Sequence, residues 1–363
     1  MTTAARAIST LLRSYLWDNP AALDQNLLQS LSAEQWLEVH QLALRQGVCA
    51  IVLDAIMSAE VAIPRPIKMR FISSTDTIEH KYHDKVQVAQ KLEKVYSDNG
   101  IKLMILKGIG LAQLYPIPQH RPCSDIDIWL FGEQNRGDKL LSEKYNVRIN
   151  EAHHHHTVFY INGVMIENHY DFIEQHSRSS KGAIESTLKH LSVEGTHPTV
   201  DIEGTPFYIP APDLNALFLT MHSGAHFAAE NISIRHLMDW AMFLKRYSGD
   251  IDREQLLHSA DKFGFRPFLE CINSACISYL GMPEQLTVCT MSDRCTVERA
   301  VEDVLQYKSR EIPSNFFAGW AFRIRRRFAN LWKQKMVFND NHITAFIRSF
   351  LTHIIHPNRW RKE

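Results

Sequence analysis

Hydrophobic and polar positions divide the chain into a helical first part, a mixed middle part and a helical last part. Up to about residue 99 the apolar positions recur at helical spacing, and Ser32–Gln35 has the form of a capping box ahead of an apolar helix face. Charged and apolar residues interleave from Ile67 to Tyr96, which predicts one long helix or two. Asn99-Gly100 marks the end of this segment, because glycine commonly follows a helix.

Strand patterns replace the helical pattern between about residues 100 and 210. Ile101–Leu106 is a short apolar run typical of a buried strand. Within Ser124–Leu130, acidic and apolar residues alternate from Asp125 to Ile128, which is strand periodicity. Asn162-Gly163 lies between two β-type runs, which is the signature of a two-residue type I′ hairpin. A second hairpin is expected around Glu203-Gly204, and after Pro212 the helical pattern resumes.

These patterns predict an α+β protein, in which a small mixed β-sheet core is flanked by N-terminal and C-terminal helical regions. We place the N-terminal helical region at residues 1–99, the α/β core at 100–210 and the C-terminal helical region at 211–363. A chain of 363 residues is long enough for about two or three domains.

Composition and charge add few constraints. The 40 basic residues balance the 40 acidic ones, so the whole molecule has no general attraction to nucleic acid or membranes. The six cysteines are scattered and form no C-x-x-C pair, which favours a reduced, cytoplasmic protein. No run reaches the roughly 18 apolar residues of a membrane span, and the N-terminus does not read as a secretory signal. We therefore expect no transmembrane segment.

The stretch from Phe322 onward is locally basic and rich in aromatic residues. Its basic side chains are Arg323, Arg325, Arg326, Arg327, Lys333, Lys335, Arg348, Arg359, Arg361 and Lys362. The favoured interpretation is a helical subdomain with a solvated basic face. The alternatives are contact with an anionic membrane surface or with a nucleic-acid backbone.

Two carboxylates on the central strand are the first candidates for chemistry. Asp125 and Asp127 stand two positions apart, so their side chains point to one face while the intervening isoleucine points to the other. Their Cα atoms are expected to lie roughly 6.5–7 Å apart. Carboxylates at that spacing can converge on two cations about 3.5–4 Å apart, as in two-metal phosphoryl chemistry. Without a cation, like charges so close together would repel each other.

A third carboxylate follows from the register of the predicted hairpin. If Asn162 and Gly163 form the loop, the cross-strand pairs are Ile161 with Val164, Tyr160 with Met165, Val158 with Glu167, His156 with His169 and His154 with Asp171. Paired residues share a face of the sheet. Glu167 therefore lies on the face of His156 and His169, and it is the candidate third acidic residue.

A glycine turn precedes the aspartates. Lys107-Gly108-Ile109-Gly110 follows an apolar strand and precedes a short helix. Glycine lets the backbone approach a phosphate closely, and a helix N-terminus presents free N–H groups. This pattern is weak when taken without the carboxylates, since glycines are common in turns.

The motifs together resemble a known family. The quoted positions are Leu106-Lys107-Gly108, Leu111, Tyr115-Pro116, Arg121 and Ser124-Asp125-Ile126-Asp127-Ile128. They resemble the polymerase-β-type nucleotidyltransferase superfamily and, more narrowly, the bacterial uncharacterised nucleotidyltransferase family with its K-G…Y-P…R…D-I-D pattern. Ile166–His169 resembles the V-E-x-H strand of that family, and Ile234–Ala241 is similar to its R-x-L-x-D helix. The resemblance covers about residues 35–250.

The resemblance implies an Mg²⁺-dependent nucleotidyltransferase that moves an NMP from an NTP to a hydroxyl group. Asp125 and Asp127 would hold two Mg²⁺ ions, and Glu167 would bind the ion that activates the acceptor. The nucleotide would be bound by residues of the turn and its surroundings: Lys107, Gly108, Gly110, Arg121 and Ser124. The acceptor stays open among a small molecule, a sugar, a protein and an RNA.

One departure from the superfamily keeps a second function open. Many members carry Gly-Ser at the turn, where the serine contacts the triphosphate. Here Lys107-Gly108 is followed by Ile109, so Lys107 or Arg121 is left to supply that contact. The alternative is a catalytically inactive binding or regulatory module, similar to an antitoxin.

Histidines are the remaining candidates. If His153–His156 form a strand, neighbouring side chains point to opposite faces, so at most two of the four share a face. His154 and His156 are expected on the face of Glu167. Contact with substrate phosphates and zinc binding are both open for them. His222 and His226 have the helical spacing of metal ligands, but packing or hydrogen bonding near the site is favoured, because no H-E-x-x-H glutamate accompanies them. Arg235 and Asp239 are spaced to form an ion pair.

Overall fold

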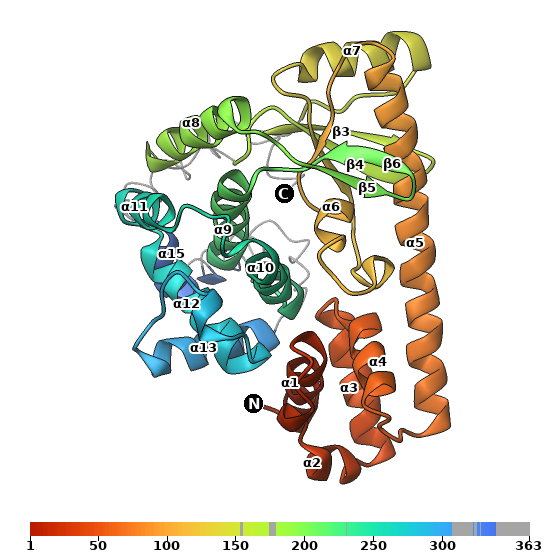
Figure 1. Ribbon diagram of the computed structural model, residues 1–363, viewed down its shortest axis with the longest axis vertical. Helices are drawn as coiled ribbons and strands as arrows, with labels where there is room; N and C mark the ends of the chain where they lie inside the picture. The colour runs from red at the N-terminus through yellow and green to blue at the C-terminus, as the bar shows by residue number, and fades with distance from the viewer. Residues whose placement is uncertain are drawn as a thin grey trace.

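The computed structural model describes residues 1–152, 155–173, 179–229, 231–306, 322, 325–326 and 328–338. Along these residues helices come first, a six-stranded sheet occupies the middle, and further helices follow (Figure 1). The α+β class predicted from the sequence is therefore confirmed, with a mixed sheet between helical flanks.

The N-terminal part is helical, as predicted. Its helices are α1 (Thr3–Leu16), α2 (Gln25–Gln29), α3 (Ala33–Arg45), α4 (Cys49–Ser58) and α5 (Arg65–Ser97), with a 3-10 helix η1 (Pro20–Ala22). The capping box before α3 is present, because Ser32 and Gln35 each accept a hydrogen bond from the other's backbone N–H. The interleaved segment forms one continuous helix, α5, and Gly100 follows it with a φ of +69°. This helix runs along one side of the molecule from the N-terminal helices to the sheet (Figure 1).

The sheet is mixed, with the order β3-β4-β2-β1-β6-β5. Its strands are β1 (Met104–Ile105), β2 (Ile126–Trp129), β3 (His156–Ile161), β4 (Val164–His169), β5 (Thr199–Ile202) and β6 (Thr205–Tyr208). β2 pairs with β4 in parallel and β1 with β6 in parallel, whereas the other neighbours are antiparallel. The strand around Ile101–Leu106 is shorter than predicted, and β2 begins at Ile126, one residue after Asp125.

Both predicted hairpins are confirmed. Asn162 and Gly163 have φ values of +51° and +79°, and Glu203 and Gly204 have +50° and +85°. Positive φ at both positions is what a type I′ turn requires. The β3–β4 register has the expected pairs, namely Ile161 with Val164, Tyr160 with Met165, Val158 with Glu167 and His156 with His169. His154, the expected partner of Asp171, lies outside the described residues.

Two helices occur where the hydrophobic pattern predicted none. They are α7 (Gln134–Tyr145) and α8 (Ser179–Glu194). The short α6 (Ile109–Ala112) is the helix expected after the glycine turn, and a 3-10 helix, η2 (Pro118–His120), follows it. The buried face of α7 is small and partly polar, since it contains Gly137 and Asp138 beside Leu141. Asp138 accepts hydrogen bonds from Thr157 and Asn168 of the sheet at 2.8 Å each. A helix held in this way has little apolar periodicity to detect.

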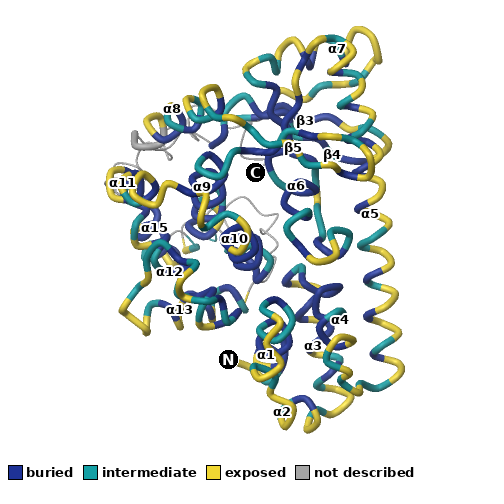
Figure 2. Tube along the Cα trace, in the orientation of Figure 1, coloured by how far each residue is buried: buried dark blue, intermediate teal, exposed yellow. Residues whose placement is uncertain are grey.

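Helices also follow the sheet. They are α9 (Pro212–Ala229), α10 (Ile234–Tyr247), α11 (Arg253–Phe263), α12 (Arg266–Leu280), α13 (Arg294–Leu305) and α15 (Leu331–Val337), with a 3-10 helix η3 (Glu284–Leu286). Most of α9 and α10 is buried (Figure 2). One hydrophobic cluster joins the N-terminal helices to these helices, and it includes Ile8 of α1 and Leu269 of α12. A second cluster packs the sheet against α5. The division at residues 99 and 210 stays a prediction.

Much of the basic C-terminal stretch lies outside the described residues, including Arg323, Arg327, Arg348, Arg359, Arg361 and Lys362. Of the described members, Lys333 does not belong to a solvated basic face. Its side chain is 2% exposed and forms an ion pair with Asp303 of α13. The predicted contact with an anionic surface therefore stays a prediction that rests on the other basic residues.

The conformation of the β3–β4 turn gives a prediction for stability. Gly163→Ala should lower the free energy of unfolding by about 1 kcal/mol, since alanine is strained at a φ of +79°. Gly182 lies inside α8 with open space around its Cα, so Gly182→Ala should instead raise this free energy by roughly 0.5–1 kcal/mol. Urea denaturation of both variants measures the two effects, and equal changes would refute the turn assignment.

Candidate functional site

The two neighbouring strands β2 and β4 bring the acidic residues together. Asp127 and Glu167 are direct partners in the parallel register, so their side chains leave the sheet on the same face. Ligand atoms of Asp127, Glu167 and His169 all lie within 4.8 Å of one another. Asp125 stands just before β2 and raises the concentration of negative charge further. The three carboxylates predicted from the sequence therefore meet at one place.

These side chains are reached from an open cleft. The cleft has a volume of about 820 Å³ and is bounded by the end of the sheet, the glycine turn and the helices α9 and α10. Asp125, Asp127 and Glu167 all line it, as do Lys107 and Ser124. Asp127 is nevertheless almost fully buried, with 1% of its side chain exposed. The acidic group therefore lies at the bottom of a cleft wide enough for a ligand.

Lys107 neutralises the buried aspartate. Its Nζ lies 2.9 Å from Oδ1 of Asp127 and 3.2 Å from Nε2 of His222 on α9. Burial together with the ammonium of Lys107 lowers the pKa of His222 well below its usual value, so this ring is neutral and accepts from the ammonium. The expectation that His222 bonds near the site, in place of binding metal, agrees with this contact.

His169 is a second cation at the acidic group. Its Nε2 lies 3.1 Å from Oδ1 of Asp127 and 3.7 Å from Oε2 of Glu167. Burial acts against protonation, but the two carboxylates outweigh it and raise the pKa of His169 to about 9. The hairpin register predicts His169 on the face of Glu167, but the sequence assigns it no role. Its position two residues after Glu167 on the same strand was the available signal.

The two cations set the protonation states of the carboxylates. Burial acts to raise the pKa of Asp127, but Lys107 and His169 outweigh it and hold the pKa below its usual value. Burial also acts to raise the pKa of Glu167, and the interaction with His169 reverses this effect. By contrast, burial and the charge of Asp127 raise the pKa of Asp125. Oxygen-rich ligands of this kind suit Mg²⁺, whose charge would stabilise the ionised form of Asp125.

The glycine turn lies directly against the aspartates. Gly108 has a φ of +57°, and a Cβ placed there would be 3.2 Å from the backbone oxygen of Asp125. Glycine is therefore needed at this position for both conformation and space. Gly110 has a different environment, since it is buried where α6 packs on Ile105, and its N–H bonds to the Lys107 carbonyl at 3.0 Å. Ser124 donates to Oδ1 of Asp125 at 2.9 Å.

A buried ion pair fixes this turn to α10. Arg121 donates to both carboxylate oxygens of Asp239, at 2.9 and 2.7 Å, and Tyr115 donates to the same carboxylate at 2.7 Å. Another nitrogen of Arg121 donates to the Gly108 carbonyl at 3.2 Å. Asp239 was expected to pair with Arg235, which instead donates to the Pro122 carbonyl at 3.1 Å. The reason is that the planar guanidinium of Arg121 meets the carboxylate side by side.

Comparison with known proteins agrees with this geometry. The model of a family described as uncharacterised nucleotidyltransferases matches residues 32–281, more than half of the chain and every residue of the site described above. The chain belongs to this nucleotidyltransferase family. Membership supports a nucleotidyltransferase activity and implies an NTP substrate. No curated protein and no solved structure matches the chain. Within the described part of the chain, no helix has both the length and the apolar character to cross a membrane.

The buried ion pair gives a second prediction. Arg121→Met and Asp239→Leu should each lower the free energy of unfolding by about 3–5 kcal/mol, because each leaves a buried charge without its partner. The double variant should lose much less than the sum of the two. Urea denaturation of the wild type, both single variants and the double variant completes this double-mutant cycle. Lys94→Ala is the control, because it breaks the exposed pair of Lys94 and Asp98 and should leave the urea midpoint unchanged. Additive losses would show that the pair is not coupled.

Proposed function

We propose that the protein is an Mg²⁺-dependent nucleotidyltransferase that transfers an NMP from an NTP to a hydroxyl group of an acceptor. The observation that carries the proposal is the direct pairing of Asp127 with Glu167 across β2 and β4, at the bottom of an open cleft. Family membership supports the class of reaction. A cytoplasmic location stays a prediction.

Asp125, Asp127 and Glu167 are the residues that would hold the metal. When bound there, two Mg²⁺ ions would lower the pKa of the acceptor hydroxyl and neutralise the charge that develops on the phosphates. The carboxylates fit hard cations because they offer oxygen ligands. The sheet register holds Asp127 beside Glu167, and Asp125 lines the same cleft directly before β2. In the proposed assignment, Asp125 and Asp127 would hold the two ions and Glu167 would be a further ligand.

Lys107 is the residue that we assign to the phosphates of the NTP. In the structure its ammonium compensates the charge of Asp127. A divalent cation on Asp127 would take over that compensation and leave the ammonium to bind phosphate oxygens. Its neighbours on α9, His222 and the ring of Phe218, are neutral and would not compete for the charge.

The rest of the turn orients the nucleotide. Gly108 and Ser124 line the cleft beside the carboxylates, and they are proposed to approach the phosphates. Arg121 also lines the cleft, but its guanidinium already donates to Asp239 and to the Gly108 carbonyl. Direct phosphate contact by Arg121 stays a prediction. Arg121 can instead hold the glycine turn in place through the hydrogen bonds that it already makes. Gly110 contributes in the same indirect way, by letting α6 pack on β1.

The alternative is an inactive member that binds a partner with the same fold. It is favoured by the contacts of Lys107 and His169 with Asp127, because they neutralise the acidic group without a metal ion. Incubating the protein with each labelled NTP and Mg²⁺ separates the two functions. The proposed enzyme releases pyrophosphate or modifies itself or an added acceptor, whereas the binding module does neither.

A variant of the third carboxylate tests the proposal. Glu167→Gln should lower NTP turnover by more than ~100-fold while NTP binding is partly retained, since it removes a metal ligand and keeps the shape of the side chain. Pyrophosphate release measures turnover, and equilibrium binding of labelled NTP measures the second quantity. Glu194→Gln is the matched control, because Glu194 is 68% exposed on α8. Turnover of Glu167→Gln at the wild-type rate would refute the role of Glu167.

A further inference from the structure

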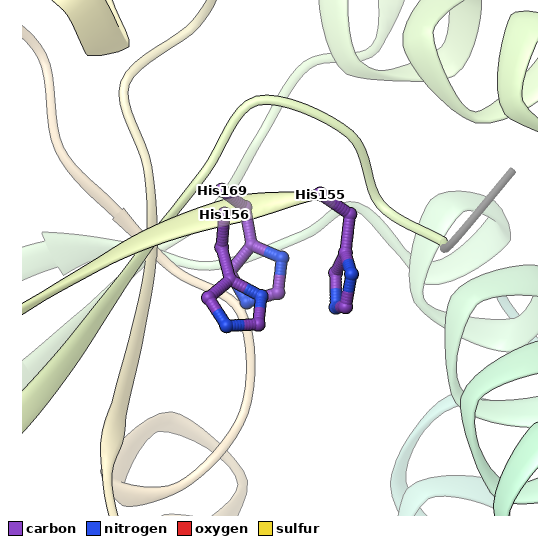
Figure 3. Close-up of side chains that lie close together, drawn as sticks. All are labelled: His155, His156 and His169. Atoms are coloured by element: carbon purple, nitrogen blue, oxygen red, sulfur yellow. The ribbon is translucent and has the colours of Figure 1, made fainter. Parts of the chain in front are cut away.

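Three histidine side chains meet beside the carboxylates. His155, His156 and His169 offer ring nitrogens that all lie within 4.8 Å of one another. Figure 3 shows the three rings on the same side of the strand ribbon. The ring centroid of His156 lies 4.2 Å from the ring centroid of His155 and 5.2 Å from that of His169.

The sheet fixes the backbone of all three residues. His156 is the first residue of β3 and pairs directly with His169, the last residue of β4. The carbonyl of His155 accepts hydrogen bonds from the N–H groups of Tyr170 and Asp171, at 3.0 and 3.1 Å. A site whose ligands come from paired strand ends needs little ordering when it binds an ion.

The arrangement differs from the one predicted from strand alternation. Alternation placed His154, not His155, on the face of His156. The structure shows β3 beginning at His156, so His155 lies outside the pleated strand and its ring is not forced to the opposite face. The position of His154 lies outside the described residues.

The separations fit one divalent ion with nitrogen ligands. Zinc binds histidine nitrogens at about 2.0–2.1 Å, so nitrogens on one ion lie about 4 Å or less apart. The rings therefore need to move by ~1 Å or less to share an ion. All three histidines line the cleft, which leaves a further coordination position facing the open space. Glu167 lies 3.8 Å from His156 and 3.7 Å from His169, within reach as an additional ligand.

We propose that His155, His156 and His169 form a binding site for one divalent transition-metal ion of the zinc class, separate from the Mg²⁺ bound by the aspartates. Imidazole nitrogen binds Zn²⁺ and Co²⁺ in preference to Mg²⁺, which favours oxygen ligands. The proposal concerns metal binding and stands whether or not the protein transfers nucleotides. Ligand atoms of His169 also lie within 4.8 Å of those of Asp127 and Glu167, so the two sites adjoin each other. Metal binding requires a neutral imidazole, so His169 would release to solvent the proton that it shares with Asp127 when the ion binds.

Cobalt binding tests the proposal, with the full-length, metal-free protein carrying no histidine tag. Co²⁺ is added in the absence of nucleotide, and its visible absorption is recorded. One equivalent should bind with the strong absorption of four- or five-coordinate Co²⁺, excess Mg²⁺ should not displace it, and Zn²⁺ should. His155→Ala and His156→Ala should each weaken Co²⁺ binding by at least ~10-fold, because each removes a ligand.

Two further variants give the comparison that decides the test. His80→Ala removes a histidine whose side chain is 75% exposed and should bind Co²⁺ as the wild type does. Asp125→Asn removes a proposed Mg²⁺ ligand but no histidine, and it should also retain the Co²⁺ absorption. His155→Gln replaces His155→Ala if the alanine variant fails to fold, as judged by its thermal unfolding without metal.

The outcomes are distinct from those of the nucleotidyltransferase proposal. Wild-type affinity in the folded His155 variant, or a weak absorption that Mg²⁺ abolishes, would overturn the histidine site. Loss of Co²⁺ binding in the His155 variant supports it even if no NTP is ever turned over. Conversely, pyrophosphate release without Co²⁺ binding to the histidines would leave the proposed function intact and refute this inference.

Discussion

Negative charge buried at the start of β2 is the constraint on which the site depends. The carboxylate of Asp127 has 1% of its surface exposed and directly adjoins Glu167 on β4, with Asp125 close by. Such a cluster is unfavourable unless cations compensate it. Lys107 and His169 provide that compensation in the structure, each within 3.1 Å of the same carboxylate oxygen. In the proposed function, divalent ions held by the carboxylates would take over this compensation.

The surrounding fold holds this charged group in place by a few long-range contacts. The parallel pairing of β2 with β4 places Glu167 directly beside Asp127, and the turn at Asn162-Gly163 sets which residues of β3 pair with β4. The turn around Gly108 is held against α10 by the ion pair of Arg121 with Asp239. The helices therefore contribute to the site by fixing the loop that carries Lys107.

Local signals predicted much of the site because short-range geometry determines it. The dipeptide Asn162-Gly163 fixes a turn type, the turn fixes the register, and the register places Glu167 opposite Val158. The two-residue spacing of Asp125 and Asp127 likewise predicts that their side chains point to the same face. The helical flanks and the capping box at Ser32 follow from equally local patterns.

Contacts between distant residues escaped prediction for a physical reason. Asp239 lies 118 residues from Arg121, and sequence spacing favoured the nearby Arg235 as its partner. The helix α7 was missed because buried hydrogen bonds to Asp138 hold it in place of an apolar face. The orientation of His155 depends on where β3 begins, and a shift of one residue reverses the side that strand alternation predicts.

A crystal structure of the protein with Mg²⁺ and a non-hydrolysable NTP tests the central claim most directly. We expect density for divalent ions between Asp125, Asp127 and Glu167, with the triphosphate in the cleft and the ammonium of Lys107 moved from Asp127 to a phosphate oxygen. A nucleotide bound away from the carboxylates, or a triphosphate in the cleft with no metal ion and with Lys107 still on Asp127, would contradict the two-metal mechanism.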